Sequence, residues 1–171
     1  FLPDSNPASR AEFEAWLTAK AASADPMFFA VIDKKTGRVE GRQSLMDINT
    51  AHGSAEIGHI LWGPRIAGTR VATEAFFLFA DYVFGLGYRR YQWRCNARNA
   101  PSRRAAERFG YTFEGIFRQN MVVKGENRDT AWFSIIDAEW PRLRAGYQAW
   151  LRPENFDAAG QQKEKLLVRA A

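Results

Sequence analysis

The hydrophobic pattern of this chain changes period near its centre, and this change constrains the fold more than any other feature. Residues 55–62 have a strand pattern that ends at Gly63-Pro64, whereas residues 72–84 place apolar side chains at helical intervals. Residues 88–95 again alternate apolar and polar side chains. A strand–helix–strand unit needs a crossover connection, so we expect the two strands to be parallel.

A helix and two strands are predicted ahead of this unit. Residues 9–22 have helical spacing with Ser9 as a plausible N-cap. Residues 28–32 and 38–48 are predicted strands joined by a turn at residues 33–37. Because short turns connect them, we expect the first three strands to be antiparallel.

Four more elements are predicted after the crossover. They are a helix, two strands and a last helix, at residues 99–108, 112–123, 130–136 and from 141 onward. Residues 124–127 are the expected turn between the two strands. The elements predict one α/β domain over residues 1–151, followed by a polar tail over residues 152–171.

Composition and length fit such a domain. The chain has 171 residues, of which 46% are hydrophobic and 25% charged, and this balance excludes a disordered or collagen-like chain. Its longest apolar run, residues 75–80, is far shorter than the roughly 18 residues of a membrane span. A single cysteine, Cys95, cannot form an internal disulfide, so we expect a cytoplasmic protein without a membrane partner.

The net charge of +5 suggests nucleic acid, an acidic membrane surface or an anionic small molecule as partner. The arginines gather in three short segments, at residues 65–70, 89–98 and 103–108, without an unbroken basic block. This distribution favours a local anion site and makes nucleic acid an unlikely partner. We expect no metal site, because Cys95, His52 and His59 cannot supply a ligand cluster.

Ordered motifs over residues 28–151 resemble the GNAT family of acetyl-CoA-dependent N-acetyltransferases, and within it the branch that acetylates N-terminal alanine and serine of ribosomal proteins. The residues that carry the resemblance are Glu56-Ile57-Gly58-His59, Trp62-Gly63-Pro64, Ala72-Thr73-Glu74-Ala75, Asn96-x-x-Asn99-x-x-Ser102, Phe109-Gly110-Tyr111, Glu114-Gly115, Arg118, Lys124-Gly125, Arg128-Asp129, Trp132-Phe133-Ser134 and Asp137-x-Glu139-Trp140. The Asn-x-x-Asn-x-x-Ser element is the most specific of these.

The resemblance implies a GNAT fold, in which a mixed, mostly antiparallel sheet is splayed between the strands ending at Trp62 and Cys95 and has helices on both faces. It also implies that the family's first strand and helix lie ahead of residue 1 and are missing from this sequence. Acetyl-CoA is the implied cosubstrate and a primary amine the implied acceptor, and a homodimer is possible.

The turn at residues 65–72 is the expected pyrophosphate site, because free backbone N–H groups and the positive end of a helix dipole meet there. The family's Arg/Gln-x-x-Gly-x-Gly/Ala pattern can be aligned in two registers. One is set by the following helix and puts Ala67, Arg70 and Ala72 at the pattern positions; the other starts at Arg65 and uses Gly68. We prefer the first, in which the Arg70 side chain could itself pair with phosphate. An ordinary basic connection between a strand and a helix is the alternative.

The expected cosubstrate-binding residues extend from this turn to the ends of the neighbouring elements. They are Leu61, Trp62, Arg65, Ile66, Ala67, Gly68, Thr69, Arg70, Val71, Ala72, Asn99 and Ser102. Asn99 also suffices as a helix N-cap without any ligand. By the resemblance, Ser102 lies beside the thioester sulfur and protonates the departing thiolate.

Glu56 and His59 are the candidates for the base that acetyl transfer to an amine requires. Strict alternation along a strand sends them to opposite faces, so only one faces a given groove unless the strand bulges. The alternatives are a salt bridge for Glu56 and a core position for His59. Cys95 is expected to be a small core residue rather than a nucleophile, because the sequence offers it no basic partner.

The acceptor amine is predicted from the resemblance alone. The resemblance puts a protein or peptide N-terminal amine first and a small-molecule amine second, with Trp62 and Phe117 as candidates for aromatic walls. A CoA-binding sensor without catalysis and a basic RNA-associated protein are the competing classes.

Overall fold

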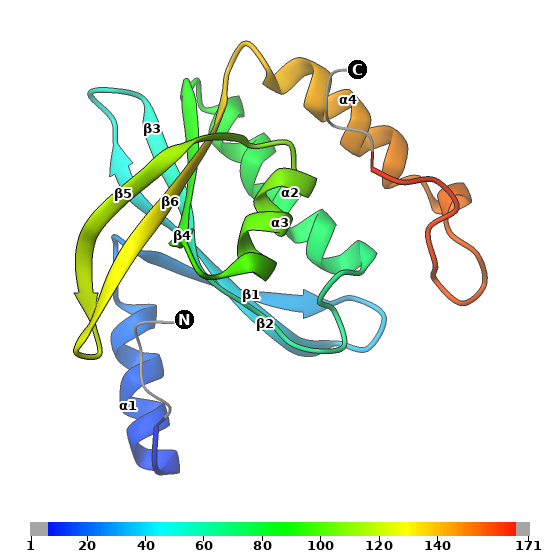
Figure 1. The fold of residues 1–171 in the computed structure, drawn as a ribbon. Helices are drawn as coiled ribbons and strands as arrows, with labels where there is room; N and C mark the ends of the chain where they lie inside the picture. Colours follow the sequence, from blue (N-terminus) through cyan, green and yellow to red (C-terminus); the bar gives the residue numbers. More distant parts are fainter. Residues whose placement is uncertain (1–6, 167–171) are drawn as a thin grey trace.

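A computed structural model describes residues 7–166 as a six-stranded sheet with helices on both faces (Figure 1). In chain order the elements are α1 (Arg10–Ala21), β1 (Met27–Asp33), β2 (Arg38–Asn49), β3 (Ser54–Trp62), α2 (Arg70–Gly85), β4 (Arg90–Asn96), α3 (Ala100–Arg108), β5 (Thr112–Val123), β6 (Glu126–Ile136), α4 (Trp140–Trp150) and the 3-10 turn η1 (Pro153–Asn155). Every predicted helix and strand is present.

The strand order is β1-β2-β3-β4-β6-β5, and only β3 and β4 are parallel. Their pairing covers three residue pairs, from Ser54 with Arg90 to Glu56 with Gln92. Beyond Glu56 the two strands diverge and no longer form a ladder with each other. The predicted crossover, the parallel pair and the splay of the sheet are confirmed.

Side-chain alternation on β1 shows which helices cover which face. Phe29 packs edge-on against Phe79 of α2, with ring centroids 5.0 Å apart. Its neighbour Phe28 points the other way, where the Lys20 ammonium of α1 lies 5.2 Å from the centroid of its ring. We call these two sides the α2 face and the α1 face of the sheet.

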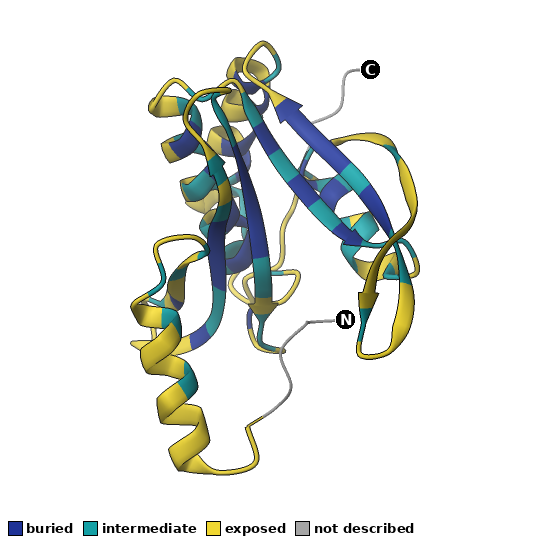
Figure 2. Cartoon of the chain, turned by 90° about the vertical axis from the view of Figure 1, so that its left-hand side faces the viewer, coloured by how far each residue is buried: buried dark blue, intermediate teal, exposed yellow. Residues whose placement is uncertain are grey.

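The core lies on the α2 face. Phe76 of α2 is fully buried and stacks on Phe109 at 4.4 Å between centroids, and the Tyr147 hydroxyl of α4 donates a hydrogen bond to the Phe109 carbonyl over 2.9 Å. Helix α1 has no buried residue and is exposed along most of its length (Figure 2). Helix α1 therefore covers its face of the sheet much less than α2 covers the other.

Three element boundaries differ by two residues or more from the sequence prediction. Strand β4 starts at Arg90, two residues after the predicted start. Helix α2 starts at Arg70, two residues before the predicted start, with Thr69 as N-cap. Strand β6 starts at Glu126 rather than at residue 130, because Lys124 and Gly125 take φ values of 54° and 80° and form a two-residue hairpin turn. This tight turn lengthens β6, whereas β5 has the predicted bounds.

The segment after α4 folds back onto that helix as far as residue 166. The Trp150 indole donates a hydrogen bond to Gln162 Oε1 over 3.0 Å, and the Asn155 side-chain amide donates to the Trp150 carbonyl over 2.9 Å. Residues 167–171 of the predicted tail lie outside the described residues. Within residues 7–166, no helix is both long and apolar enough to cross a membrane.

Candidate functional site

A cavity of about 400 Å³ opens where β3 and β4 part. It is lined from both faces of the sheet, since Glu56 and Arg94 belong to the α1 face and Trp93 and Cys95 to the α2 face. The predicted site residues that it brings together are Glu56, His59, Leu61, Asn99 and Ser102. The cavity thus joins the α2 side, where α3 begins, to the α1 side.

A bulge in β3 puts Glu56 and His59 on the same face. Leu61 pairs with Arg42 and Gly58 pairs with Ser44, so β3 uses one residue more than β2 over this stretch. His59, at the bulge, has a φ of 48°. Its ring lies 5.1 Å from that of Phe28, on the α1 face to which Glu56 also points. The bulge is the exception that the sequence prediction allowed for.

Glu56 is 3% exposed, and its carboxylate accepts a hydrogen bond from Arg94 Nε. Arg94 also forms an ion pair with Asp47. Burial raises the pKa of Glu56 to about 7, against the opposing effect of Arg94 and with a smaller contribution from the nearby Asp47 charge. The carboxyl group can therefore exchange a proton near neutral pH, as a general base must.

Ser102 lies on the other side of the cavity, in the first turn of α3. Asn99 caps this helix, because its side-chain oxygen accepts a hydrogen bond from the Ser102 amide over 3.2 Å. The Trp93 indole donates to Ser102 Oγ over 3.0 Å. Since the hydroxyl oxygen already accepts this bond, its own proton can be donated. Burial raises the pKa of the neighbouring Cys95 thiol, which favours the protonated form over a nucleophilic thiolate.

In the turn between β3 and α2, the amides of Ile66, Ala67 and Thr69 donate to carbonyls within the turn. The Thr69 hydroxyl donates to the Ile66 carbonyl over 2.7 Å instead of capping the helix. The amides of Arg70, Val71 and Ala72 lie in the first turn of α2, where helix geometry provides no intrahelical acceptor. Such a helix start suits an anionic phosphate group.

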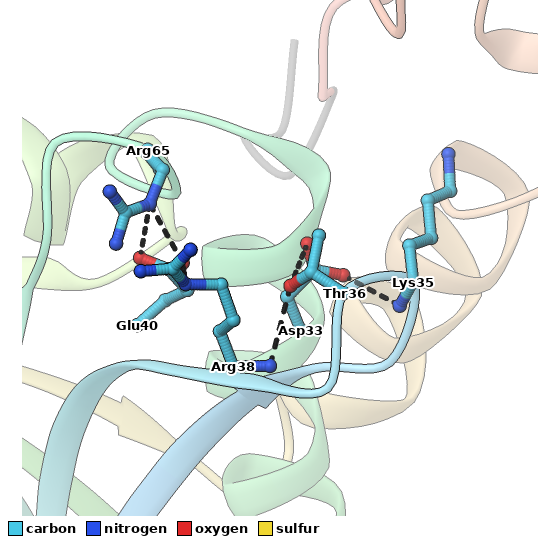
Figure 3. Close-up of polar contacts among 6 residues, drawn as sticks. All are labelled: Asp33, Lys35, Thr36, Arg38, Glu40 and Arg65. Carbon is cyan, nitrogen blue, oxygen red and sulfur yellow. Dashed lines mark hydrogen bonds and ion pairs between the residues drawn. The ribbon is translucent and has the colours of Figure 1, made fainter.

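The two arginine side chains of this turn have other partners. Arg65 Nε donates to both carboxylate oxygens of Glu40, over 2.7 and 2.8 Å, and Arg38 lies 3.7 Å from the same carboxylate (Figure 3). Arg70 Nη2 donates to the Leu151 carbonyl over 2.5 Å, and its guanidinium lies 5.0 Å from the centre of the Phe156 ring. In this structure the Arg70 side chain is directed to the C-terminal segment.

The turn residues line a different cavity from Glu56 and Ser102. This second cavity, of about 850 Å³, lies between β1, α2 and the C-terminal segment. The predicted binding residues that line it are Arg65, Ile66, Thr69, Arg70 and Val71. Of the remaining three turn residues, Gly68 has a φ of 75°, Ala72 is buried and Ala67 donates its amide to the Gly63 carbonyl over 2.9 Å.

The two aromatic candidates for the acceptor wall lie on opposite faces. Trp62 packs against Phe109 in the core, 5.8 Å between centroids, and donates its indole N–H to Gln43. Phe117 is 55% exposed and packs against Trp132 at 4.9 Å on the α1 face. Only Phe117 therefore lies on the face of Glu56.

Several residues of the site were not identified from the sequence. They are the partners Asp47, Arg94, Trp93 and Glu40, and two β6 residues that line the cavity, Arg128 and Thr130. The alternation along β4 could have identified Arg94, because its side chain points to the face of the sheet opposite to that of Trp93 and Cys95. Among residues 7–166, no group of three or more His, Cys, Asp or Glu side chains is arranged to hold a metal ion.

Comparison with known proteins gives consistent matches. The model of the acetyltransferase (GNAT) domain matches residues 1–112. A GCN5-related N-acetyltransferase from Brucella melitensis is 65% identical and superposes with a TM-score of 0.94, over 96% of this chain and 75% of its own. The uncharacterized N-acetyltransferase p20 of Bacillus licheniformis is 31% identical over 113 residues, which are 66% of this chain and 63% of p20. The match thus spans less than two thirds of that relative.

A more distant solved structure concerns the branch of the family that acetylates ribosomal proteins. A Vibrio cholerae protein assigned to the ribosomal-protein-serine acetyltransferases is 23% identical, with a TM-score of 0.67 over 75% of this chain and 76% of its own. At 23% identity this likeness shows a common fold and gives no information about the acceptor of the present protein. Together, the split sheet, the cavity through it and the family match show that the chain belongs to the GNAT family of N-acetyltransferases.

Proposed function

We propose that this protein is an acetyl-CoA-dependent N-acetyltransferase that acts on a primary amine, in the first place the N-terminal amine of a protein or peptide. The observation that carries the proposal is the cavity through the split sheet, which Glu56 and Ser102 both line. A proton acceptor and a proton donor thus face one space from two different elements.

The residues present fit acetyl-CoA, which supplies an activated acetyl thioester when bound. The uncapped amides at the start of α2 offer donors to a pyrophosphate. Beyond Glu56, β3 has no ladder partner on its β4 side, so its backbone can hydrogen-bond to the amides of an extended ligand arm. Asn99 and Ser102 line the cavity that such an arm would enter.

Glu56 and Ser102 have complementary roles in this proposal. Glu56 takes the proton from the amine, directly or through a water molecule, because its pKa of about 7 leaves the carboxylate available at neutral pH. As the amine nitrogen bonds to the thioester carbonyl carbon and the carbon–sulfur bond breaks, Ser102 gives its hydroxyl proton to the departing thiolate and recovers a proton from solvent. The Trp93 indole fixes the position of Oγ. His59 faces the same cavity and helps to position the amine.

We further propose a cytoplasmic location and a homodimer. The buried single cysteine supports a cytoplasmic location. Exposed apolar side chains on the edge strand β5, among them Phe117 at 55% and Val122 at 77% exposure, support a homodimer. Light scattering tests the dimer, with a mass of one chain as the contrary result.

Two measurements test the function. Calorimetric titration with acetyl-CoA is expected to show saturable binding, and a folded chain without such binding at near-millimolar ligand contradicts the proposal. A thiol-release screen should then compare short peptides beginning with Ser, Ala or Thr with a panel of small amines. Turnover confined to small amines would make the protein a small-molecule acetyltransferase. CoA binding without thiol release would make it a sensor, and salt-sensitive RNA binding without CoA binding an RNA-associated protein.

A further inference from the structure

Two polar groups that line the cavity have no hydrogen-bond partner within residues 7–166. One is the hydroxyl of Thr130, a residue that is 1% exposed, and the other is the buried Nε of Arg128. A buried polar group without a partner is destabilising, and more so when it is charged. These two groups differ from unpartnered groups in the core, such as the Tyr91 hydroxyl, because they line the cavity, where a ligand can complete their hydrogen bonds.

Both groups lie on the same face as Glu56. On β6, the fully buried Ala131 and Phe133 belong to the core on the α2 face, so Arg128, Thr130 and Trp132 point to the α1 face. The Arg94 guanidinium lies 4.8 Å from the centre of the Trp132 ring and bonds to Glu56. Thr130 is the next residue on that face, roughly 7 Å further along β6.

The two arginines that line the cavity, Arg94 and Arg128, differ in whether a carboxylate pairs with them. Arg94 is paired with both Glu56 and Asp47. Arg128 forms no salt bridge with any carboxylate of the described residues, although its charge is one of those that act on Glu56. Asp129, its neighbour in the chain, accepts hydrogen bonds from the Gln119 amide and the Asn127 side chain instead. Arg128 is therefore the cation left for a ligand.

We propose that Arg128 and Thr130 bind a carboxylate of the acceptor, so that the preferred substrate is a primary amine with a carboxylate close to it. The inference rests on the function proposed above and narrows its acceptor. A planar guanidinium with a neighbouring hydroxyl matches a carboxylate well. The cavity is small, about 400 Å³, so the carboxylate must belong to the same residue as the amine or to the next one.

Two matched pairs of acceptors separate these sources of the carboxylate. Serine and serinamide differ in the α-carboxylate and are compared at equal concentrations of neutral amine. The C-terminally amidated peptides Ser-Glu-Ala and Ser-Gln-Ala differ only in the charge of the second side chain. We expect kcat/KM to be about 10-fold or more higher for the acidic member of at least one pair, through a lower KM.

The variant Arg128→Gln should raise KM for the preferred acidic acceptor by about 10- to 100-fold and leave the neutral member within about twofold. Arg128→Lys should recover part of the preference, and Thr130→Val should weaken it by a smaller factor. Arg118→Gln is the matched control, because Arg118 is exposed on β5 and does not line the cavity. Circular dichroism shows whether each variant is folded; if Arg128→Gln is not, Arg128→Lys and Thr130→Val provide the test.

Three results would overturn the proposal: equal rates within both pairs, a preference that survives in the folded Arg128 and Thr130 variants, or spermidine as the best acceptor. A protein without acetyltransferase activity can be distinguished from one without the proposed carboxylate site. If no amine yields free thiol, calorimetric titration with both matched pairs still decides the point. Binding at least about 10-fold tighter for the acidic member of either pair supports the anion site, and equal binding within both pairs contradicts it.

Discussion

Two buried glutamates, Glu40 and Glu56, are similar in burial and in their pairing with arginine, but they differ in the exposure of that arginine and in what the carboxylate faces. They are 7% and 3% exposed, and each carboxylate accepts hydrogen bonds from an arginine. The partners of Glu40, Arg65 and Arg38, have side chains that are 64% and 67% exposed. The partner of Glu56, Arg94, is 24% exposed and shared with another carboxylate.

The difference lies in what each carboxylate faces. Glu56 lines the cavity through the split sheet, whereas Glu40 lines neither of the two cavities described above. Glu40 instead holds the turn that leads to α2, through its carboxylate to Arg65 and through its backbone carbonyl, which accepts the Gly63 amide over 2.8 Å. Burial and an arginine partner therefore do not distinguish the proposed base Glu56 from Glu40; only its place in the cavity does.

The largest expected effect is that of Glu56→Gln. We expect kcat/KM to fall by about 10²- to 10³-fold, within the range for loss of a general base. In the wild type, the base is protonated below a pKa of about 7, so activity should rise as pH increases through 7. The variant should lose this limb of the pH profile, while the limb due to the acceptor amine stays.

Glu40→Gln is the matched control for this experiment, because it makes the same chemical change at a carboxylate outside the cavity. Its pH profile should keep the limb near 7. A Glu56→Gln enzyme with an unchanged profile, or a Glu40→Gln enzyme that loses the limb, would reverse the roles assigned to the two residues.

A smaller effect is expected for Ser102→Ala. We expect kcat to fall by about 10-fold, less than is typical of general acid–base residues, because a thiolate is a good leaving group even without a proton donor. Ser102→Thr keeps the hydroxyl and serves as the control. The pH limb near 7 should persist in both variants, since it belongs to Glu56. An unchanged rate in Ser102→Ala would remove the proposed acid.

The sequence predicted the fold because each element has its own local pattern. Ser9 and Asn99 cap the helices as expected, and the change of period at the centre predicted the crossover and hence the single parallel pair. The candidates Glu56 and Ser102 were also available from the motif order. These features depend on neighbours within a few residues or on the connection between successive elements.

What the sequence could not supply depends on register between distant strands. The residue with positive φ at the bulge is His59 rather than glycine, so the sequence pattern gives no indication of the bulge. The contact of Arg94 with Glu56 joins residues 38 apart in the sequence. The direction of Arg70 is set by the Leu151 carbonyl, 81 residues away, and by the Phe156 ring, in a segment whose composition suggested only a polar tail.

The smallest effect should come from Glu40→Gln itself, measured on the cosubstrate. The substitution keeps the shape of the side chain but removes the charge that holds Arg65, so the turn before α2 should become less ordered. We expect KM for acetyl-CoA to rise by about 3- to 10-fold with little change in kcat, because only binding of the phosphate end is affected. Arg38→Gln is the control, since Arg38 approaches Glu40 only to 3.7 Å and does not belong to the turn. A fall in kcat without a change in KM would place Glu40 in the chemical step and remove the distinction between the two glutamates.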